Sequence, residues 1–393
     1  MRVRETLQNP FEYGRELDAA ELCDRTEELA RIGRTADNRA RLFLIGPRRY
    51  GKTSLLHAAQ TQLAKRGVTV LRFDAERYES PDRLAEAMLR AATRLLRGPV
   101  AKARTMFLEA AKRLKPELSF DAATQEWNLS LGVTREAAAP IPMLADVLDV
   151  IDRLAAVTKQ PTLVIIDEFQ QVVAEGGTDA ERQLRAAVQQ HRHVGYVFAG
   201  SATHLLSDMV TKRGRAFYRM GESLHLGALP RPAFEAYVRT RFTAYGLTIT
   251  DDGLEALMSL GEEVPLAVQR LAHECWEQCR VAPRTRLDAR AVQAVLNDVL
   301  ARESPAYTRA WTSLTKAQKI ALKTVVLEGG RALFSQDVAA RSGLAVGTMQ
   351  RALKALEQMQ WVRTDDAAKP VRYRLDDPLF GAWVRWAQGW KAP

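Results

Sequence analysis

The segment from Gly46 to Thr53 constrains the fold more than any other part of the chain. It reads Gly-Pro-Arg-Arg-Tyr-Gly-Lys-Thr, with four residues between its two glycines and then a lysine and a hydroxyl side chain. The preceding run Arg41–Ile45 is apolar and predicts a buried strand, whereas Lys52–Lys65 carries leucine and alanine at helical spacing. A glycine-rich turn between a strand and a helix is typical of a phosphate-binding loop. We therefore expect a nucleotide-binding α/β domain.

This loop has the groups that nucleotide phosphates require. Its backbone N–H groups can converge on the β- and γ-phosphate oxygens, at the positive end of the following helix. Lys52 would neutralise these oxygens, and the Thr53 hydroxyl would bind Mg²⁺. A glycine-rich turn with an exposed lysine is the alternative, but it leaves the next motif unexplained. The predicted ATP-contacting residues are Gly46, Pro47, Arg48, Arg49, Tyr50, Gly51, Lys52, Thr53 and Ser54.

Two adjacent acids follow a second apolar run. Thr162–Ile166 predicts a buried strand, and Asp167 and Glu168 come directly after it. An acid at the carboxyl end of a parallel strand faces the phosphate crevice. Asp167 would hold Mg²⁺ through its hydration shell, and Glu168 would accept a proton from the attacking water or orient it. Hydrolysis, as distinct from binding, therefore depends on Glu168. The alternative makes both acids ordinary charges at a strand end.

Further polar residues follow the next predicted strand, Val194–Ala199. Ser201 could touch the γ-phosphate or the water, or it could cap a helix. Arg213, Arg215 and Arg219 form a basic cluster before a predicted strand at 222–226. An arginine finger acting on a neighbouring subunit is one interpretation, with Arg219 favoured, and a solvated or DNA-facing patch is the other. The predicted catalytic residues are Lys52, Glu168, Ser201 and Arg219.

Cysteine content and hydropathy indicate the compartment. Three cysteines in 393 residues cannot form a disulfide framework, which is typical of a reducing cytoplasm. His273, Cys275 and Cys279 lie on one predicted helix, but zinc would need a fourth ligand, so we expect packing cysteines. No uncharged run reaches the ~20 residues of a membrane helix, and no apolar signal segment follows Met1. We expect a soluble cytoplasmic protein without a membrane partner.

The order of predicted elements indicates three domains. Strands and helices alternate over residues 1–230, with further elements at 68–73, 81–96 and 179–191, which predicts a parallel sheet covered by helices. An insertion at about 97–140 holds a basic segment, predicted helical over 101–114, and a candidate hairpin over 118–133. Residues 231–310 predict an all-helical domain, with helices at 232–244, 251–261, 264–280 and 288–302. The third domain spans 311–393.

The third domain has the pattern of a winged helix. Helices are predicted at 315–327, 335–342 and 345–359, followed by a hairpin at 361–375. Met349, Leu353, Leu356 and Met359 form one apolar stripe on the last helix. Residues 311–393 carry 13 Lys and Arg against 7 Asp and Glu, of a chain net charge of +10, which favours DNA over a protein partner. The candidate DNA-contacting residues are Thr348, Gln350, Arg351, Lys354, Arg363, Lys369, Arg372 and Arg374.

Several segments together resemble the archaeal-type ATPases of the STAND/AAA+ group, near the origin-recognition initiators. They are Asn9–Phe11 with Tyr13 and Gly14, Arg25 with Glu28 and Leu29, and the segments 46–56, 166–170, 200–201, 217–219 and 373–383. The resemblance implies a P-loop NTPase core, a helical lid and a C-terminal winged helix, with ATP and Mg²⁺ as cofactors. Two departures are Asp24, where a glycine is usual, and Gly261–Pro265, where a Gly-Gly-x-Pro turn is common. Relatives with a nuclease-like domain extend further, so no nuclease activity is implied.

The leading functional hypothesis is an ATPase that couples its nucleotide state to double-stranded DNA through the winged helix. The first alternative is a nucleotide-controlled assembly switch, in which the winged helix binds a partner protein. The second is a nucleotide-binding scaffold with negligible turnover. A homo-oligomer is expected if Arg219 acts on a neighbouring subunit.

Overall fold

The computed structural model describes residues 8–96, 105, 116–121, 126–131, 140–201, 204–281, 285–365, 371–387 and 389. The chain divides into two compact units. The first, the core unit, comprises Glu16–Gly227, and the second, the helical unit, comprises Met1–Arg15 with Ala228–Pro393. No helix in the described ranges has the length and apolar character needed to span a bilayer.

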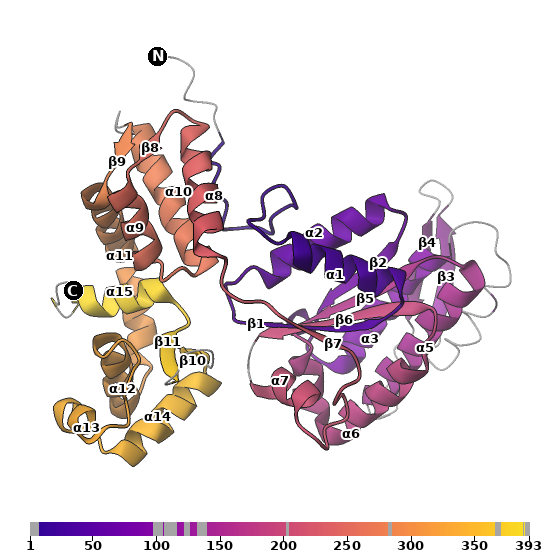
Figure 1. The fold of residues 1–393 in the computed structure, drawn as a ribbon. Coiled ribbons are helices and arrows are strands. Elements are labelled where there is room, and N and C mark those ends of the chain that lie inside the picture. The colour runs from indigo at the N-terminus through magenta and orange to yellow at the C-terminus, as the bar shows by residue number, and fades with distance from the viewer. Residues whose placement is uncertain are drawn as a thin grey trace. The chain divides into compact units, whose positions relative to one another are not determined.

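The core unit is built on a five-stranded sheet in the order β2-β5-β6-β1-β7 (Figure 1). Its strands are β1 (Arg41–Gly46), β2 (Thr69–Asp74), β5 (Thr162–Asp167), β6 (Val194–Ser201) and β7 (Glu222–His225). Every adjoining pair is parallel, as predicted. In this order β6, which ends in Ser201, lies between β1 and β5. Strand β1 precedes the phosphate loop, and β5 ends in Asp167. Ser201 is in register with Gly46, and Asp167 with Asp74.

Helices cover both faces of this sheet, which a parallel sheet requires because its strands are buried on both sides (Figure 1). They are α1 (Thr26–Asp37), α2 (Lys52–Lys65), α3 (Pro81–Ala92), α5 (Pro140–Thr158), α6 (Gln170–Gln190) and α7 (His204–Thr211), with short 3₁₀ turns at Ala75–Arg77 and Thr93–Leu95. Side chains from α3, α5, α6 and α7 share one buried core with Phe43, Phe73 and Ile166. On the other face α1 packs against β6, where a Cβ at Gly195 would lie 2.7 Å from the Thr35 carbonyl oxygen.

The helices of the core unit differ from the sequence prediction at three places. The pattern predicted a helix from Asp179, and α6 begins earlier, at Gln170, but its backbone is not helical at Gly177, where φ is 68° and ψ is −164°. The predicted helix therefore corresponds to the stretch of α6 after this kink, and the stretch before it was missed. Helices α1 and α5 were not predicted.

The insertion is described only in part. Strands β3 (Pro116–Asp121) and β4 (Glu126–Leu131) pair antiparallel, which confirms the hairpin. The basic segment predicted to be helical over 101–114 lies outside the described residues except for Thr105.

The helical unit begins with four helices: α8 (Arg231–Thr243), α9 (Asp251–Leu260), α10 (Pro265–Val281) and α11 (Ala289–Thr312). The prediction of an all-helical segment was wrong in one respect, since two-residue strands β8 (Thr248–Ile249) and β9 (Arg286–Leu287) pair parallel between the helices. Residues before the core unit pack here as well. Phe11 lies 4.6 Å from Phe242 between ring centroids, and Asn9 donates a hydrogen bond to the His273 carbonyl.

The rest of the helical unit has the arrangement of a winged helix. It comprises α12 (Lys316–Leu327), α13 (Gln336–Ser342), α14 (Val346–Gln358), an antiparallel hairpin of β10 (Val362–Asp365) and β11 (Arg372–Leu375), and α15 (Pro378–Ala387). Met349, Leu353 and Leu356 of the predicted stripe are buried. Met359 is 49% exposed instead, because α14 ends one residue before it.

Helix α11 joins the first four helices to the winged helix. The pattern predicted an end near residue 302, but α11 continues through Pro305 to Thr312. The predicted domain boundary at 310 therefore falls inside a helix. Near the end of α11, Tyr307 and Trp311 pack against Phe380 and Trp383 of α15.

Candidate functional site

The phosphate loop, residues 46–54, folds as a tight turn between β1 and α2. Gly51 adopts φ +86°, a left-handed conformation that glycine adopts without strain. Gly46 is required for a different reason, since a Cβ there would lie 2.7 Å from the Leu226 Cβ. The two glycines therefore have separate roles, one in the conformation of the turn and one in its packing.

Lys52 lies inside this turn rather than at its surface. Its side chain is only 6% exposed, and Nζ donates hydrogen bonds to the carbonyl oxygens of Gly46 at 2.9 Å and Pro47 at 3.2 Å. The loop therefore folds around the ammonium group. This orders the lysine at the N-terminus of α2, where anions are favoured.

Thr53 and Asp167 meet across the loop and the end of β5. The Thr53 hydroxyl donates to Asp167 Oδ2 at 3.4 Å, and the Asp167 side chain is 2% exposed. Burial raises the pKa of this carboxyl, and the adjacent Glu168 raises it further, whereas Lys52 and Arg72 oppose the shift. A hydroxyl and a carboxylate in contact supply the hard oxygen ligands that Mg²⁺ prefers. The two predicted magnesium ligands therefore fit that ion.

Glu168 and Ser201 also lie together, as the sequence motifs suggested. The Ser201 hydroxyl donates to Glu168 Oε2 at 3.4 Å, and Gln170 Nε2 donates to the same oxygen. Glu168 adopts φ +49°, an uncommon conformation for a non-glycine residue, which is often found at functional sites. The prediction missed Gln170, although its polar side chain in the first turn after the acidic pair was a usable signal.

The three arginines of the predicted basic cluster have different environments. Arg215 forms an ion pair with the fully buried Glu181 at 2.6 Å, and Glu181 also accepts the Ala216 N–H. Arg215 is therefore a structural residue. Arg213 and Arg219 are exposed, and Arg219 adopts φ +54° with its guanidinium 5.3 Å from the Tyr218 ring centroid. Both remain accessible on the core unit.

The residues considered as zinc ligands lie on α10, and its cysteines are packing residues, as expected. Cys275 and Cys279 are buried, and burial raises the pKa of the Cys275 thiol. His273 lies 2.6 Å from the Phe11 carbonyl oxygen through Nδ1.

The candidate DNA-contacting residues fall into two groups. Gln350, Arg351 and Lys354 are exposed on α14, and Thr348 is half-buried beside Arg351. The hairpin arginines, namely Arg363, Arg372 and Arg374, are half-buried. Lys369 lies outside the described residues.

Two of the hairpin arginines interact with other residues of the helical unit. Arg372 Nε donates to the Gly329 carbonyl at 2.8 Å. Arg374 pairs with Asp365 at 3.2 Å and with Glu262 at 3.8 Å. Arg372 and Arg374 therefore already have hydrogen-bond or ion-pair partners within the helical unit, whereas the polar side chains of Gln350, Arg351 and Lys354 on α14 face solvent.

Residues 35–207 match a family model described as an AAA domain, and this stretch contains the phosphate loop, Asp167, Glu168 and Ser201. This segment is therefore similar to an AAA domain. No curated protein sequence matches the chain.

Solved structures extend this likeness beyond the AAA domain. A Walker-type ATPase of Pyrococcus abyssi is 17% identical, with a TM-score of 0.64 over 96% of this chain and 99% of that chain. The Orc2 protein of Aeropyrum pernix, solved in ADPNP-ADP complexes, is 14% identical, with a TM-score of 0.55 over 98% and 99%. The Orc1 protein of the same organism, solved in complex with DNA, is 14% identical, with a TM-score of 0.50 over 93% of each chain. The predicted resemblance to archaeal AAA+ ATPases and origin-recognition initiators, and the P-loop fold class, are confirmed.

The positions at which the sequence departs from the pattern that it resembles have a left-handed backbone. Asp24 adopts φ +45° where a glycine is usual. Glu262 and Glu263 adopt φ +47° and +58° in the turn where two glycines are common. Glycine adopts this conformation without strain, so a glycine would fit at each of the three positions.

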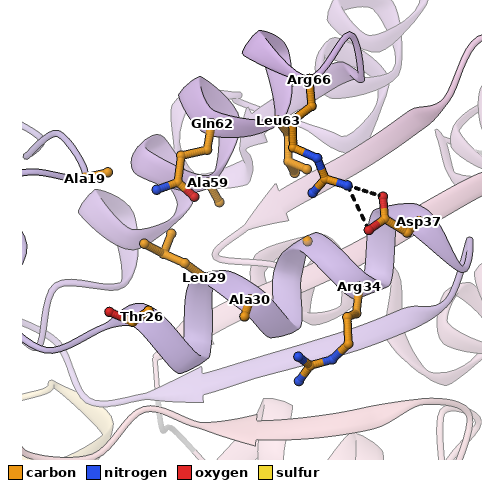
Figure 2. Close-up of a pocket in the computed structure, with 11 residues that line it drawn as sticks. Ala19, Thr26, Leu29, Ala30, Arg34, Asp37, Ala59, Gln62, Leu63 and Arg66 are labelled. Atoms are coloured by element: carbon orange, nitrogen blue, oxygen red, sulfur yellow. Dashed lines mark hydrogen bonds and ion pairs between the residues drawn. The ribbon is translucent and has the colours of Figure 1, made fainter.

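A separate cavity of about 470 Å³ lies between α1 and α2 (Figure 2). Leu29 and Ala30 of α1 face Ala59 and Leu63 of α2, and an ion pair joins Asp37 to Arg66 at 2.6 Å. No residue of the phosphate loop lines this cavity. It is therefore distinct from the candidate nucleotide site.

Proposed function

We propose that the protein binds and hydrolyses MgATP and that its nucleotide state controls DNA binding by the winged helix. The observation that carries the proposal is the convergence of Lys52, the Thr53–Asp167 pair and Glu168 at the ends of β1 and β5. AAA domains bind nucleotides, and the residues expected to do so here lie together.

The roles of these residues follow from their chemistry. Thr53 and Asp167 would hold Mg²⁺, which neutralises phosphate charge when bound. Lys52 would interact with the phosphate oxygens, in exchange for its present carbonyl partners. Glu168 would accept a proton as water attacks the γ-phosphorus and the bond to the ADP oxygen breaks. Ser201, beside Glu168, would contact the water or the released phosphate.

The winged helix supports DNA as the partner. Its segment carries a net charge of +6, and Gln350, Arg351 and Lys354 of α14 are exposed. The Orc1 structure similar to this chain was solved with DNA. A helix with exposed polar side chains suits the major groove, and basic residues of a hairpin suit phosphates.

A second candidate function is a STAND-type switch whose winged helix binds a protein. It is favoured by the apolar side chains of Phe334 and Val371, which are 39% and 49% exposed. Aromatic residues such as phenylalanine are enriched at the cores of protein interfaces.

Steady-state ATP turnover, with and without duplex DNA, separates these functions. We expect turnover that DNA stimulates. Slow turnover that ignores DNA would instead favour the switch, and tight ADP binding without turnover would indicate a scaffold.

A further inference from the structure

Gln170, the first residue of α6, lies against the candidate general base. Its side chain is 5% exposed, Nε2 donates a hydrogen bond to Glu168 Oε2, and the same nitrogen lies 3.3 Å from Ser201 Oγ. An amide buried to this extent next to a carboxylate costs free energy unless it is hydrogen-bonded. The amide nitrogen has such partners, whereas Oε1 is hydrogen-bonded to no described residue.

The two oxygens of the Glu168 carboxylate have different environments. Oε2 accepts from Gln170 and from the Ser201 hydroxyl. Within the described ranges, no donor is hydrogen-bonded to Oε1. One oxygen is thus anchored and the other is left for a proton from water. A glutamate with three rotatable side-chain bonds gains catalytic precision from such an anchor.

Gly200 provides the space in which the Gln170 amide lies. A Cβ at this position of β6 would lie 2.1 Å from Gln170 Oε1 and 3.2 Å from Gln170 Cδ. Gly200 does not have a left-handed φ, so space rather than conformation explains the glycine. The absence of a side chain at Gly200 leaves room for the amide carbonyl, while the amide N–H group donates to Glu168.

We propose that Gln170 is a positioning residue that orients Glu168 for proton transfer, and that Gly200 provides the space for the Gln170 amide. This inference rests on the proposed ATP hydrolysis. It assigns a role to the residue that follows the acidic pair by two positions, and it explains why β6 has a glycine just before Ser201.

The first test separates turnover from binding. Gln170→Leu removes the donor and should lower kcat roughly 10- to 100-fold, because hydrogen bonds to charged groups are strong. The affinity for ATP should not change, since Gln170 is not part of the phosphate loop. Gln171→Leu is the matched control, since the next residue of α6 is half-buried and should tolerate the change. In a Glu168→Gln background, Gln170→Leu should add little.

The second test measures stability instead of activity. Gly200→Ala should lower Tm in the wild type because the new Cβ collides with Gln170. In a Gln170→Ala background the same change should cost much less, because the space is free. An equal loss of Tm in both backgrounds would assign the clash to Leu206, whose Cδ2 lies 2.8 Å from the same Cβ. That result would overturn the proposal that Gly200 provides the space for Gln170.

The outcomes distinguish this inference from the function on which it rests. Turnover by the wild type that Gln170→Leu leaves unchanged overturns the inference alone. A parallel loss of ATP affinity and turnover also overturns it, because Gln170 would then support the site as a whole. If Gln170→Leu does not fold, Gln170→Met keeps the side-chain length and serves in its place. Absence of turnover in the wild type overturns the proposed hydrolysis and the inference together.

Discussion

The ammonium group of Lys52 already has carbonyl partners in the loop that it is expected to serve. We predict that Lys52→Ala abolishes ATP binding, because the ammonium group supplies the positive charge for the phosphates. The fold should persist, because Lys52 is not part of the hydrophobic core of the α/β sheet. Binding of labelled ATP and the circular dichroism spectrum check this prediction. Lys65→Ala, at the exposed end of the same helix, is the control. Undiminished ATP binding by Lys52→Ala would refute the phosphate-loop assignment.

Glu168 is the residue on which hydrolysis depends. Glu168→Gln keeps the shape of the side chain but removes the group that accepts a proton, so we predict that ATP binds and is not turned over. The loss of rate should be about 10²–10⁴-fold. Single-turnover assays with labelled ATP measure it. Wild-type turnover by this variant would show that another group activates the water.

At the residue scale, motifs predicted which side chains meet but not how they are held. Thr53 and Asp167 are in contact, as the two motifs together required. Gln170 and Gly200 were not recognised as a pair, because they are 30 residues apart and become neighbours only through the sheet. A single sequence contains no signal for such a contact between a helix start and a strand end.

Among the elements, the hairpin β10–β11 contacts the turn after α9 through an ion pair. Glu262 of that turn lies 3.8 Å from Arg374. We predict that Glu262→Gln raises the affinity for duplex DNA by up to about fivefold, because a half-buried ion pair of this kind contributes roughly 0–1 kcal/mol. Fluorescence anisotropy measures the change. Glu263→Gln removes the same charge one residue away, where it pairs with Arg231, and should have no such effect. Equal gains from both variants would indicate a general charge effect.

If the basic residues of the same hairpin contact phosphates, the affinity for DNA should depend on salt concentration. With about four phosphate contacts, the slope of log affinity against log salt should be about −3.6. Replacing Arg372 and Arg374 with Ala should reduce its magnitude by up to about two units for every DNA sequence, because these residues are expected to contact phosphates. Titrations of the full chain at several salt concentrations test this. A slope that stays unchanged would place the DNA contacts outside the hairpin.

Most elements were predicted to within a few residues, and the misses have physical reasons. Apolar periodicity located β1, α2, β5 and the helices of the winged helix. It missed the continuation of α11 through Pro305, because proline usually breaks a helix and tertiary context can override local propensity. At Gly177 the backbone does leave the helical region, and the predicted helix corresponds to the stretch of α6 that follows. The strand order could not be read from the chain, since β6 enters between β1 and β5 through contacts distant in sequence.

For the whole molecule, the exposed Arg219 on the core unit leads to a prediction about assembly. If Arg219 acts on a neighbouring subunit, Arg219→Ala and Lys52→Ala should each be inactive, and their mixture should regain some turnover. An intact lysine and an intact arginine can then meet at one interface, and an arginine finger contributes ~10³-fold or more in rate. Turnover of mixtures at several ratios measures the effect. Arg213→Ala, also exposed, is the comparison. A mixture as inactive as its components would exclude action between subunits.

Helix α11 has a consequence for how the chain unfolds and how it can be divided. A continuous helix of 24 residues is about 36 Å long, and it carries Tyr307 and Trp311 into the aromatic cluster with Phe380 and Trp383. The four preceding helices and the winged helix therefore share one element and part of one core, and heat should melt them as a single cooperative transition. A fragment that starts at residue 311 would lose Tyr307 and most of α11. The winged helix is best regarded as a part of a larger folding unit, not as a module that can be exchanged at its apparent sequence boundary.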